Sequence, residues 1–424
     1  MHLIVKKSKL AGEVVIPPSK SHTIRAIAIA ALAEGRSTIR NPLLSADTQA
    51  AVDCYRALGA DIDTTDPNLW KVIGTGGQIT APDKPIDVGN SGTTLRIAMG
   101  TCTFNKARPI SLTGDQQIQS RPVGPLLDAL NYLGANCKSL KNNGKAPLEV
   151  TGPLQGGKTT IAASTSQFLS SLLLCAPLAP KDTEIDVTLL NEPGYVQMTL
   201  DWLDKQKIQY ENQKFRKFKI KGGQSYKPFD ATIPADFSSA TFFLCAACLA
   251  AERVTLLGLD FADSQPDKAV FDYLKQMGAD ITIAAHSATV KASKLKGIEI
   301  DLNKTPDALP AMAVTAAFAE GTTSLVNVPQ ARAKETDRIN AMACELKKMA
   351  VDVEELPDGI IIRQSTPTPA QLHGWADHRI VMALSLAGLT LDGQCTVDTA
   401  EAVSVTFPDY VELMKSIGAN MQLK

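Results

Sequence analysis

The chain has 424 residues, with 43 Lys and Arg residues against 44 Asp and Glu residues, for a net charge of -1. This length exceeds one ordinary hydrophobic core, so two or three domains are expected. The balanced charge excludes the basic excess typical of a nucleic-acid-binding protein. Neither a long apolar run nor a signal-peptide core is visible, so we expect a cytoplasmic protein without membrane contact.

Eight cysteines are present, and Cys175, Cys245 and Cys248 lie in apolar runs. This placement predicts reduced, buried thiols. The Cys245-x-x-Cys248 spacing lacks a second pair, and the spacing of His373 and His378 fits no common ligand pattern. We therefore expect no metal site.

An internal repeat runs through the whole chain. Six times, at intervals of about 70 residues, a polar segment precedes an Ala-rich apolar stretch. In chain order the polar segments are residues 19–25, 89–96, 164–170, 236–242, 305–311 and 375–381. Stretches that are apolar nearly all round predict buried helices, and the polar segments mark the amino termini of those helices.

A second pattern runs in step with the first. Helix-like spacing ends in Gly-Ala and is followed by strand-like alternation at Gly59, Gly134, Gly278 and Gly418, with degenerate copies near Lys207 and Ala350. Glycine suits the end of a helix because it adopts the left-handed conformation without strain. The chain thus predicts six units of two helices and a few strands, arranged as two closed clusters of three.

Buried parallel helices in one cluster would direct their amino termini the same way. Such termini expose unpaired N–H groups and a partial positive charge, which suits an anion. The candidate residues at these positions are Lys20, Ser21, Arg25, Gly92, Thr165, Ser166, Gln167, Asp307 and Arg379. Arg121 follows the strand after the second segment, and Lys334, Glu335 and Arg338 lie between the fifth and sixth segments. A capped, solvated helix end explains any one of them, but six matching segments favour a shared anion site.

The segment "RAKETDR" places Lys334 and Arg338 four residues apart. We expect both on one helix face, with Glu335 able to pair with Arg338.

Seven motifs, in order and spread over nearly the whole chain, resemble the 5-enolpyruvylshikimate-3-phosphate synthase family: "PPSKSHTIRA", "GNSGTTLR", "SRPVGPLLDAL", "STSQFLSSLLL", "ARAKETDR", "ADHR" and "TFPDY". The resemblance implies an α/β fold of two domains, each built from three βαβαββ units with buried parallel helices. It implies an N-terminal domain over residues 18–229, a C-terminal domain over residues 1–17 and 230–424, and an active site in the cleft between them.

The same resemblance implies transfer of the enolpyruvyl group of phosphoenolpyruvate to the 5-hydroxyl of shikimate 3-phosphate, with release of phosphate and no cofactor. The implied phosphoenolpyruvate residues are Lys20, Gly92, Arg121, Gln167, Arg338 and Arg379. Those for shikimate 3-phosphate are Lys20, Ser21, Arg25, Thr165, Ser166, Gln167, Asp307, Gln330 and Lys334. The catalytic residues are Asp307 as base, Glu335 as acid, and Lys20. Small-molecule substrates and a monomeric state are expected.

The chain departs from the family pattern at several positions. Val405 stands where members usually have a lysine that helps to bind phosphoenolpyruvate, and Gln330 replaces an asparagine. Where many members have a serine before a "PY" segment, this chain reads "NEPGY", which places either Asn191 or Glu192 there.

Two alternatives stay open at the level of sequence. A related transferase acting on UDP-N-acetylglucosamine would carry a cysteine in the loop over residues 115–120, and this chain has none there. A non-catalytic anion-binding relative is the second alternative, because Val405 replaces the usual lysine.

Overall fold

The computed structural model describes residues 1–424. The chain divides into two compact units, one of Pro18–Ile233 and one of Met1–Pro17 with Pro234–Lys424. We call them the N-terminal and the C-terminal unit. The second crossing lies after Ile233 rather than after Phe229, because strand β14 (Asp230–Thr232) pairs with β3 of the N-terminal unit.

The N-terminal unit contains three repeats. The first comprises α1 (Lys20–Leu32), β3 (Glu34–Arg40), α2 (Ala46–Ala57), β4 (Asp61–Asp66), β5 (Leu69–Thr75) and β14. The second comprises β6 (Ile86–Asp87), α3 (Gly92–Cys102), β7 (Ile110–Thr113), α4 (Gln116–Ser120), α5 (Gly124–Tyr132), β8 (Asn136–Ser139) and β9 (Leu148–Thr151). The third comprises β10 (Gly157–Ala163), α6 (Ser166–Cys175), η1 (Ala176–Leu178), β11 (Thr183–Leu190), α7 (Pro193–Lys205), β12 (Tyr210–Gln213) and β13 (Lys217–Ile220).

The C-terminal unit repeats this plan. Its first repeat comprises β2 (Leu10–Val15), α8 (Phe237–Ala250), β15 (Ala251–Leu257), η2 (Pro266–Lys268), α9 (Ala269–Gln276), β16 (Asp280–Ala284) and β17 (Ser287–Lys291). The second comprises β18 (Glu299–Asp301), η3 (Pro306–Ala308), α10 (Leu309–Ala316), β19 (Thr322–Val326), η4 (Pro329–Ala333), α11 (Arg338–Lys348), β20 (Asp352–Leu356) and β21 (Gly359–Arg363). The third comprises β22 (Gln371–Leu372), α12 (His378–Gly388), β23 (Gln394–Val397), η5 (Ala400–Val405), α13 (Tyr410–Ser416), β24 (Asn420–Leu423) and β1 (Leu3–Lys6).

Each repeat forms one four-stranded sheet with the same pairing. In the third repeat, for example, the strands lie in the order β10-β11-β13-β12; the first pair is parallel and the other two pairs are antiparallel. The last repeat needs the N-terminal strand, because β1 lies between β23 and β24 and is antiparallel to both. This pattern confirms the six units of two helices and a few strands expected from the repeated sequence, and the βαβαββ arrangement that the family resemblance implied.

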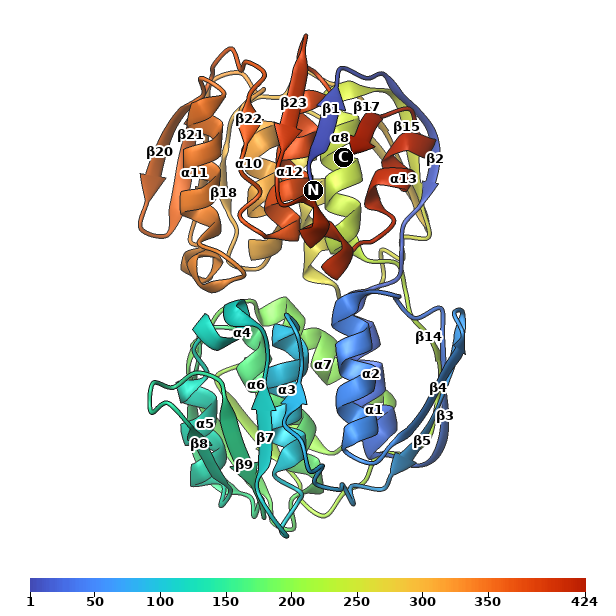
Figure 1. Ribbon diagram of the computed structural model, residues 1–424, viewed down its shortest axis with the longest axis vertical. Coiled ribbons are helices and arrows are strands. Elements are labelled where there is room, and N and C mark those ends of the chain that lie inside the picture. The colour runs from blue at the N-terminus through green and yellow to red at the C-terminus, as the bar shows by residue number, and fades with distance from the viewer. The chain divides into compact units, whose positions relative to one another are not determined.

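The Ala-rich helices form the centre of each unit. Every residue of α3, α10 and α12 is buried, as is all of α1 except Lys20 and Ser21. In the C-terminal unit α8, α10 and α12 contact one another side by side (Figure 1). The apolar sequences therefore form the buried helices that they predict.

Contacts between the first turns show which helix ends lie together. In the N-terminal unit Gln167 Nε2 donates to Thr93 Oγ1 at 3.2 Å, which joins the starts of α6 and α3. Arg25 in the second turn of α1 donates to the Ser170 hydroxyl of α6 at 3.4 Å. In the C-terminal unit Arg379 Nη2 lies 3.1 Å from Asp307 Oδ2, which joins the starts of α12 and α10.

The segment before α11 differs from expectation. Lys334 does not share a helix face with Arg338, because residues 334–337 are not helical and α11 begins at Arg338. Asp337 accepts a hydrogen bond from Asn340 N at 3.0 Å and so caps the helix at that point.

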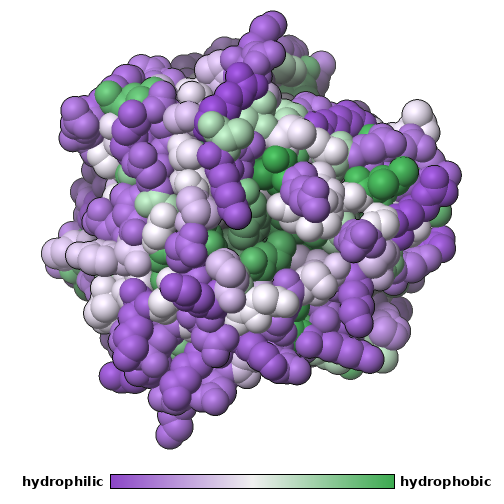
Figure 2. Space-filling model, turned by 90° about the horizontal axis from the view of Figure 1, so that it is seen from below, coloured by the Kyte–Doolittle hydropathy of each residue, from purple (hydrophilic) through white to green (hydrophobic).

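The face in Figure 2 is mostly hydrophilic, with apolar residues in several separate patches. No helix in the structure has both the length and the hydropathy needed to cross a membrane.

The helix-ending positions of the repeat adopt the left-handed backbone. Gly59, Gly134, Gly278 and Gly418 have φ values of 104°, 97°, 99° and 99°. The degenerate copies have positive φ as well, with 56° at Lys207 and 62° at Ala350. A side chain with a Cβ is strained in this region, whereas glycine is not.

We therefore predict that Ala350→Gly and Lys207→Gly each raise the free energy of unfolding by about 0.5–1 kcal/mol. Gly278→Ala is the matched converse, because its added Cβ would meet no atom closer than 3.5 Å and would test the backbone alone. It should lower the free energy of unfolding by about 1 kcal/mol. Urea unfolding followed by circular dichroism measures all three changes. Equal urea midpoints for Ala350→Gly and the parent chain would contradict the proposed backbone strain at Ala350.

Candidate active site

The start of α1 carries Lys20 beside a carboxylate. Ser19, rather than Ser21, caps the helix, because its side chain accepts from His22 N at 3.5 Å. Lys20 Nζ lies 3.0 Å from Asp47 Oδ2 in the first turn of α2. Trp202 Nε1 of α7 donates to His22 Nδ1 at 3.0 Å, which ties the same turn to α7. The helix end that bears the predicted cation is therefore held on two sides.

Arg25 is a buried cation whose hydrogen-bond acceptors are neutral oxygens. It donates to Thr199 Oγ1 at 2.9 Å, to the carbonyl oxygens of Ser21 and Tyr195 at 3.0 Å, and to the Ser170 hydroxyl. Burial lowers the pKa of the guanidinium to about 10, while Tyr195 acts in the opposite direction, so the group stays charged at neutral pH. A buried charge held only by neutral groups is costly, and an anion nearby would reduce that cost.

The start of α3 brings two arginines against a glycine. Arg121 Nη2 donates to Asn90 Oδ1 at 3.3 Å. A Cβ built on Gly92 would lie 2.7 Å from Arg121 Nη1 and 2.3 Å from Arg96 Nη1. The absence of a side chain at Gly92 thus allows both guanidinium groups to approach the amino terminus of α3.

The start of α6 is occupied by a carboxylate of the chain. Thr165 caps the helix, and Glu192 Oε2 accepts from Ser166 N at 3.1 Å and from the Ser166 hydroxyl at 2.7 Å. Asn191 instead donates through Nδ2 to Ser164 O at 3.2 Å. Of the two residues left open by the sequence, Glu192 is therefore the one whose side chain meets Thr165 and Ser166.

Parallel strands explain why these segments meet. Ala163 at the end of β10 is in register with Leu190 at the end of β11. The carboxyl ends of adjacent parallel strands lie at the same edge of a sheet, so the residues that follow each strand become neighbours.

In the C-terminal unit, Arg338 is buried among three carboxylates. Its guanidinium lies 2.8 Å from Asp377, 2.8 Å from Asp307 and 2.6 Å from Glu335. Burial alone would lower the pKa of Arg338, but the three carboxylates outweigh burial and hold the pKa above its usual value. The pairing of Glu335 with Arg338 that the sequence allowed is thus present.

Asp307 links the cations of this unit. Besides Arg338 it lies 3.1 Å from Arg379 and 3.7 Å from Lys334. Three cations around one carboxylate stabilise its ionised form. The cluster therefore combines basic groups, which attract anions, with carboxylates that can exchange protons.

Gln330 lies close to this cluster in the sequence but has a different environment. Its Nε2 donates to Asn303 O at 3.0 Å, whereas its Oε1 is buried without a hydrogen-bond partner. A buried amide oxygen without a donor is unfavourable, and a substrate hydroxyl would satisfy it. Val405, at the position of the usual lysine, ends η5 and offers no charge.

His373 and His378 lie beside different carboxylates, and His378 Nδ1 is 3.9 Å from Asp377 Oδ1. His373 Nδ1 lies 2.8 Å from Asp398, while Asp377 contacts Arg338. No group of three His, Cys, Asp or Glu residues in the structure could hold a metal ion. The eight cysteines form no disulfide, and burial raises the pKa of Cys245 to about 12, so this thiol is a packing residue.

Several positioning residues were not predicted. Asp377 holds Arg338, Asp47 holds Lys20, Asn90 holds Arg121, and Thr199 holds Arg25. Asp377 and Asn90 lie inside polar segments that the repeat had identified, so they could have been proposed. Asp47 and Thr199 lie on outer helices, and no sequence pattern singles them out.

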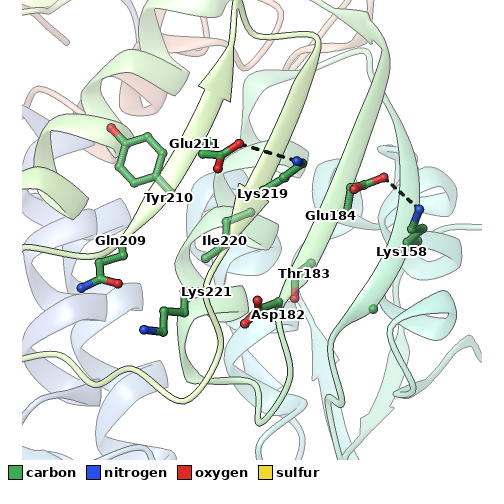
Figure 3. A pocket seen from close by; sticks show the side chains of 11 residues that line it. Lys158, Asp182, Thr183, Glu184, Gln209, Tyr210, Glu211, Lys219, Ile220 and Lys221 are labelled. Atoms are coloured by element: carbon green, nitrogen blue, oxygen red, sulfur yellow. Dashed lines mark ion pairs between the residues drawn. The ribbon is translucent and has the colours of Figure 1, made fainter.

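A separate pocket of about 590 Å³ lies on the sheet of the third repeat (Figure 3). Residues at the amino ends of β10 and β11 line this pocket, whereas Thr165 and Glu192 follow the carboxyl ends of the same strands. Two of its three lysines are paired, with Lys158 3.3 Å from Glu184 and Lys219 3.7 Å from Glu211, and none of the predicted anion-site residues lines it. This pocket is therefore not part of the predicted anion site.

Two units of three βαβαββ repeats, with cations and carboxylates at the starts of the inner helices, define the class of enolpyruvyl transferases. Among solved structures, EPSP synthase from Acinetobacter baumannii matches with a TM-score of 0.83 and 28% identity over 100% of both chains. The enolpyruvyl transferase NikO from Streptomyces tendae matches with a TM-score of 0.82 over 99% of this chain and 98% of its own, and at 19% identity it supports the fold alone.

Within that class the chain belongs to the EPSP synthase family. The family model described as EPSP synthase (3-phosphoshikimate 1-carboxyvinyltransferase) matches residues 4–414. A 3-phosphoshikimate 1-carboxyvinyltransferase of Acetivibrio thermocellus is 52% identical over 99% of both chains. One of Ruminiclostridium cellulolyticum is 49% identical over 100% of both chains. The expected α/β fold and the family resemblance are thereby confirmed.

We predict that Gly92→Ala raises the KM for phosphoenolpyruvate by about tenfold or more, because the added methyl group displaces Arg121 and Arg96 from the start of α3. Gly124→Ala is the matched control: Gly124 is also the first residue of a helix, and an added Cβ there meets no atom within 4 Å. Steady-state kinetics should give the control a KM within about twofold of the parent value. Equal KM values for both variants would contradict the role of Gly92.

Proposed function

We propose that the chain transfers the enolpyruvyl group of phosphoenolpyruvate to the 5-hydroxyl of shikimate 3-phosphate and releases phosphate. The full-length match to 3-phosphoshikimate 1-carboxyvinyltransferases carries this proposal. The gathering of basic residues at inner-helix starts within each unit supports it. The same match favours this reaction over transfer to UDP-N-acetylglucosamine.

The N-terminal unit offers the groups for shikimate 3-phosphate. Thr165 and Ser166 present hydroxyl and backbone donors at the start of α6 for the phosphate, with Gln167 beside them. Ser21 and Arg25 lie on the first two turns of α1. The buried charge of Arg25, surrounded by neutral acceptors, would be compensated by an anionic group of the substrate.

Residues of the C-terminal unit would contact the substrate hydroxyls. Asp307 and Lys334 are assigned to them with Gln330, whose buried amide oxygen can accept a hydrogen bond from a hydroxyl.

Phosphoenolpyruvate requires cations for both its carboxylate and its phosphate. We assign it Lys20, Gly92, Arg121 and Gln167 of the N-terminal unit and Arg338 and Arg379 of the C-terminal unit. Arginine forks bind such groups through two parallel hydrogen bonds. The cations offset the repulsion between two anionic substrates, which is the main obstacle to bringing them together.

The proton transfers fall to the carboxylates beside these cations. The ionised carboxylate of Asp307 takes the proton of the 5-hydroxyl while the hydroxyl oxygen attacks C2 of phosphoenolpyruvate. Glu335 delivers a proton to C3, which gives a tetrahedral intermediate. Loss of a proton from C3 and departure of phosphate then restore the double bond. Lys20, 3.0 Å from Asp47, places a further cation for the developing charge.

A monomer as the active form, as expected from the sequence, is part of the same proposal. The cytoplasmic location expected from the sequence stands as part of the same proposal.

The test is phosphate release from phosphoenolpyruvate. We expect release with shikimate 3-phosphate and none with UDP-N-acetylglucosamine. Asp307→Ala and Glu335→Gln should each slow turnover by roughly 10²-fold or more, because each removes one proton transfer.

Controls with the same chemistry are available on the solvent-facing strand β20 of the same unit. Asp352→Ala and Glu354→Gln remove exposed carboxylates that pair with Arg363, and both should leave turnover unchanged. Release with neither acceptor would refute the proposal in favour of an anion-binding protein. Near-normal turnover in Asp307→Ala and Glu335→Gln would refute the proton roles.

A further inference from the structure

We propose that Glu192 is an internal competitor of the substrate phosphate: its carboxylate occupies the donors at the start of α6 and leaves them when the phosphate binds. The inference rests on the proposed function, in which Thr165 and Ser166 receive the phosphate of shikimate 3-phosphate. It makes Glu192 a residue that sets the affinity for this substrate.

Three donors converge on one oxygen of Glu192. Oε2 accepts from Ser166 N at 3.1 Å, from Ser166 Oγ at 2.7 Å and from Thr165 Oγ1 at 3.3 Å. Glu192 and Ser166 are each 2% exposed, so little water reaches these bonds. A backbone N–H and two hydroxyls at a helix amino terminus are the donors that bind a phosphate oxygen elsewhere in proteins. Here a carboxylate of the chain fills them.

The backbone of Glu192 indicates that this placement does not come from local preference. Its φ of 58° and ψ of 48° lie in the left-handed region, which is strained for a residue with a Cβ. Pro193 follows directly, and a residue before proline favours extended backbone. The contacts of the carboxylate with α6 help to offset this strain, so they are a specific feature of the loop.

A phosphate and the Glu192 carboxylate cannot share these donors. Both are anions, and at a few ångströms inside a partly buried site they repel each other strongly. Binding of shikimate 3-phosphate therefore includes the cost of moving Glu192 away. A serine in place of Glu192 would add a donor for the phosphate instead of a competing acceptor.

The competition should discriminate between ligands. Shikimate has the same ring and carboxylate but no phosphate, so it can bind while Glu192 stays on α6. Glu192 should weaken the binding of shikimate 3-phosphate and leave the binding of shikimate unchanged.

Calorimetric titration of Glu192→Ser with each ligand tests the proposal. We expect shikimate 3-phosphate to bind at least about tenfold more tightly than to the parent chain, and shikimate to bind within about twofold. Glu184→Ser is the matched control, since it removes a carboxylate from the other end of β11, where Glu184 pairs with Lys158. It should change neither affinity. Unchanged or weaker binding of shikimate 3-phosphate to Glu192→Ser would overturn the proposal.

Two further variants keep the outcomes distinct. If Glu192→Ser does not fold, as judged by circular dichroism, Glu192→Gln carries the test: it keeps an acceptor for α6 but removes the charge. It should bind shikimate 3-phosphate about threefold or more tightly, and no gain would overturn the proposal.

Ser166→Ala should weaken shikimate 3-phosphate binding. If it does so while Glu192→Ser brings no gain, only the competitor role fails. If Ser166→Ala has no effect, the phosphate position in the proposed function fails as well.

Discussion

Charge compensation at the starts of buried helices is the constraint on which the rest of this structure depends. The starts of helices in both units carry partial positive charge and basic side chains at partly buried positions, where an unpaired cation is costly. In each unit the chain supplies carboxylates that reduce this cost. Asp307, Glu335 and Asp377 surround Arg338, and Asp47 pairs with Lys20. A site built in this way is stable enough to fold and still able to exchange its internal partners for anionic substrates.

The repeated βαβαββ plan places these charges with few special devices. In each repeat the first two strands are parallel, so the segments that follow them meet at one edge of the sheet. In four repeats one segment starts the inner helix and the other starts the outer helix; in the first repeat of each unit the first strand instead leads into the inner helix of the other unit. Ser166 and Glu192 meet in this way in the third repeat. The plan lets a few polar positions per repeat form a site, while the Ala-rich stretches between them form the core.

Much of this organisation could be predicted from the sequence, because it depends on local patterns. Gly59 and its counterparts mark helix ends through their backbone freedom, and even the degenerate copies at Lys207 and Ala350 adopt positive φ. The start of α11 could not be placed correctly, because Asp337 caps the helix three residues after Lys334. The partner of Lys20 on α2 and the contact of Glu192 with α6 depend on tertiary packing, to which short-range periodicity does not respond.

The most direct measurement is a crystal structure of the chain bound to shikimate 3-phosphate and phosphoenolpyruvate. The account predicts that anionic groups of the substrates contact the basic residues that carboxylates of the chain compensate in this structure, namely Lys20, Arg338 and Arg379. Substrates bound away from these residues, with the ion pairs of Lys20 and Arg338 unchanged, would contradict it.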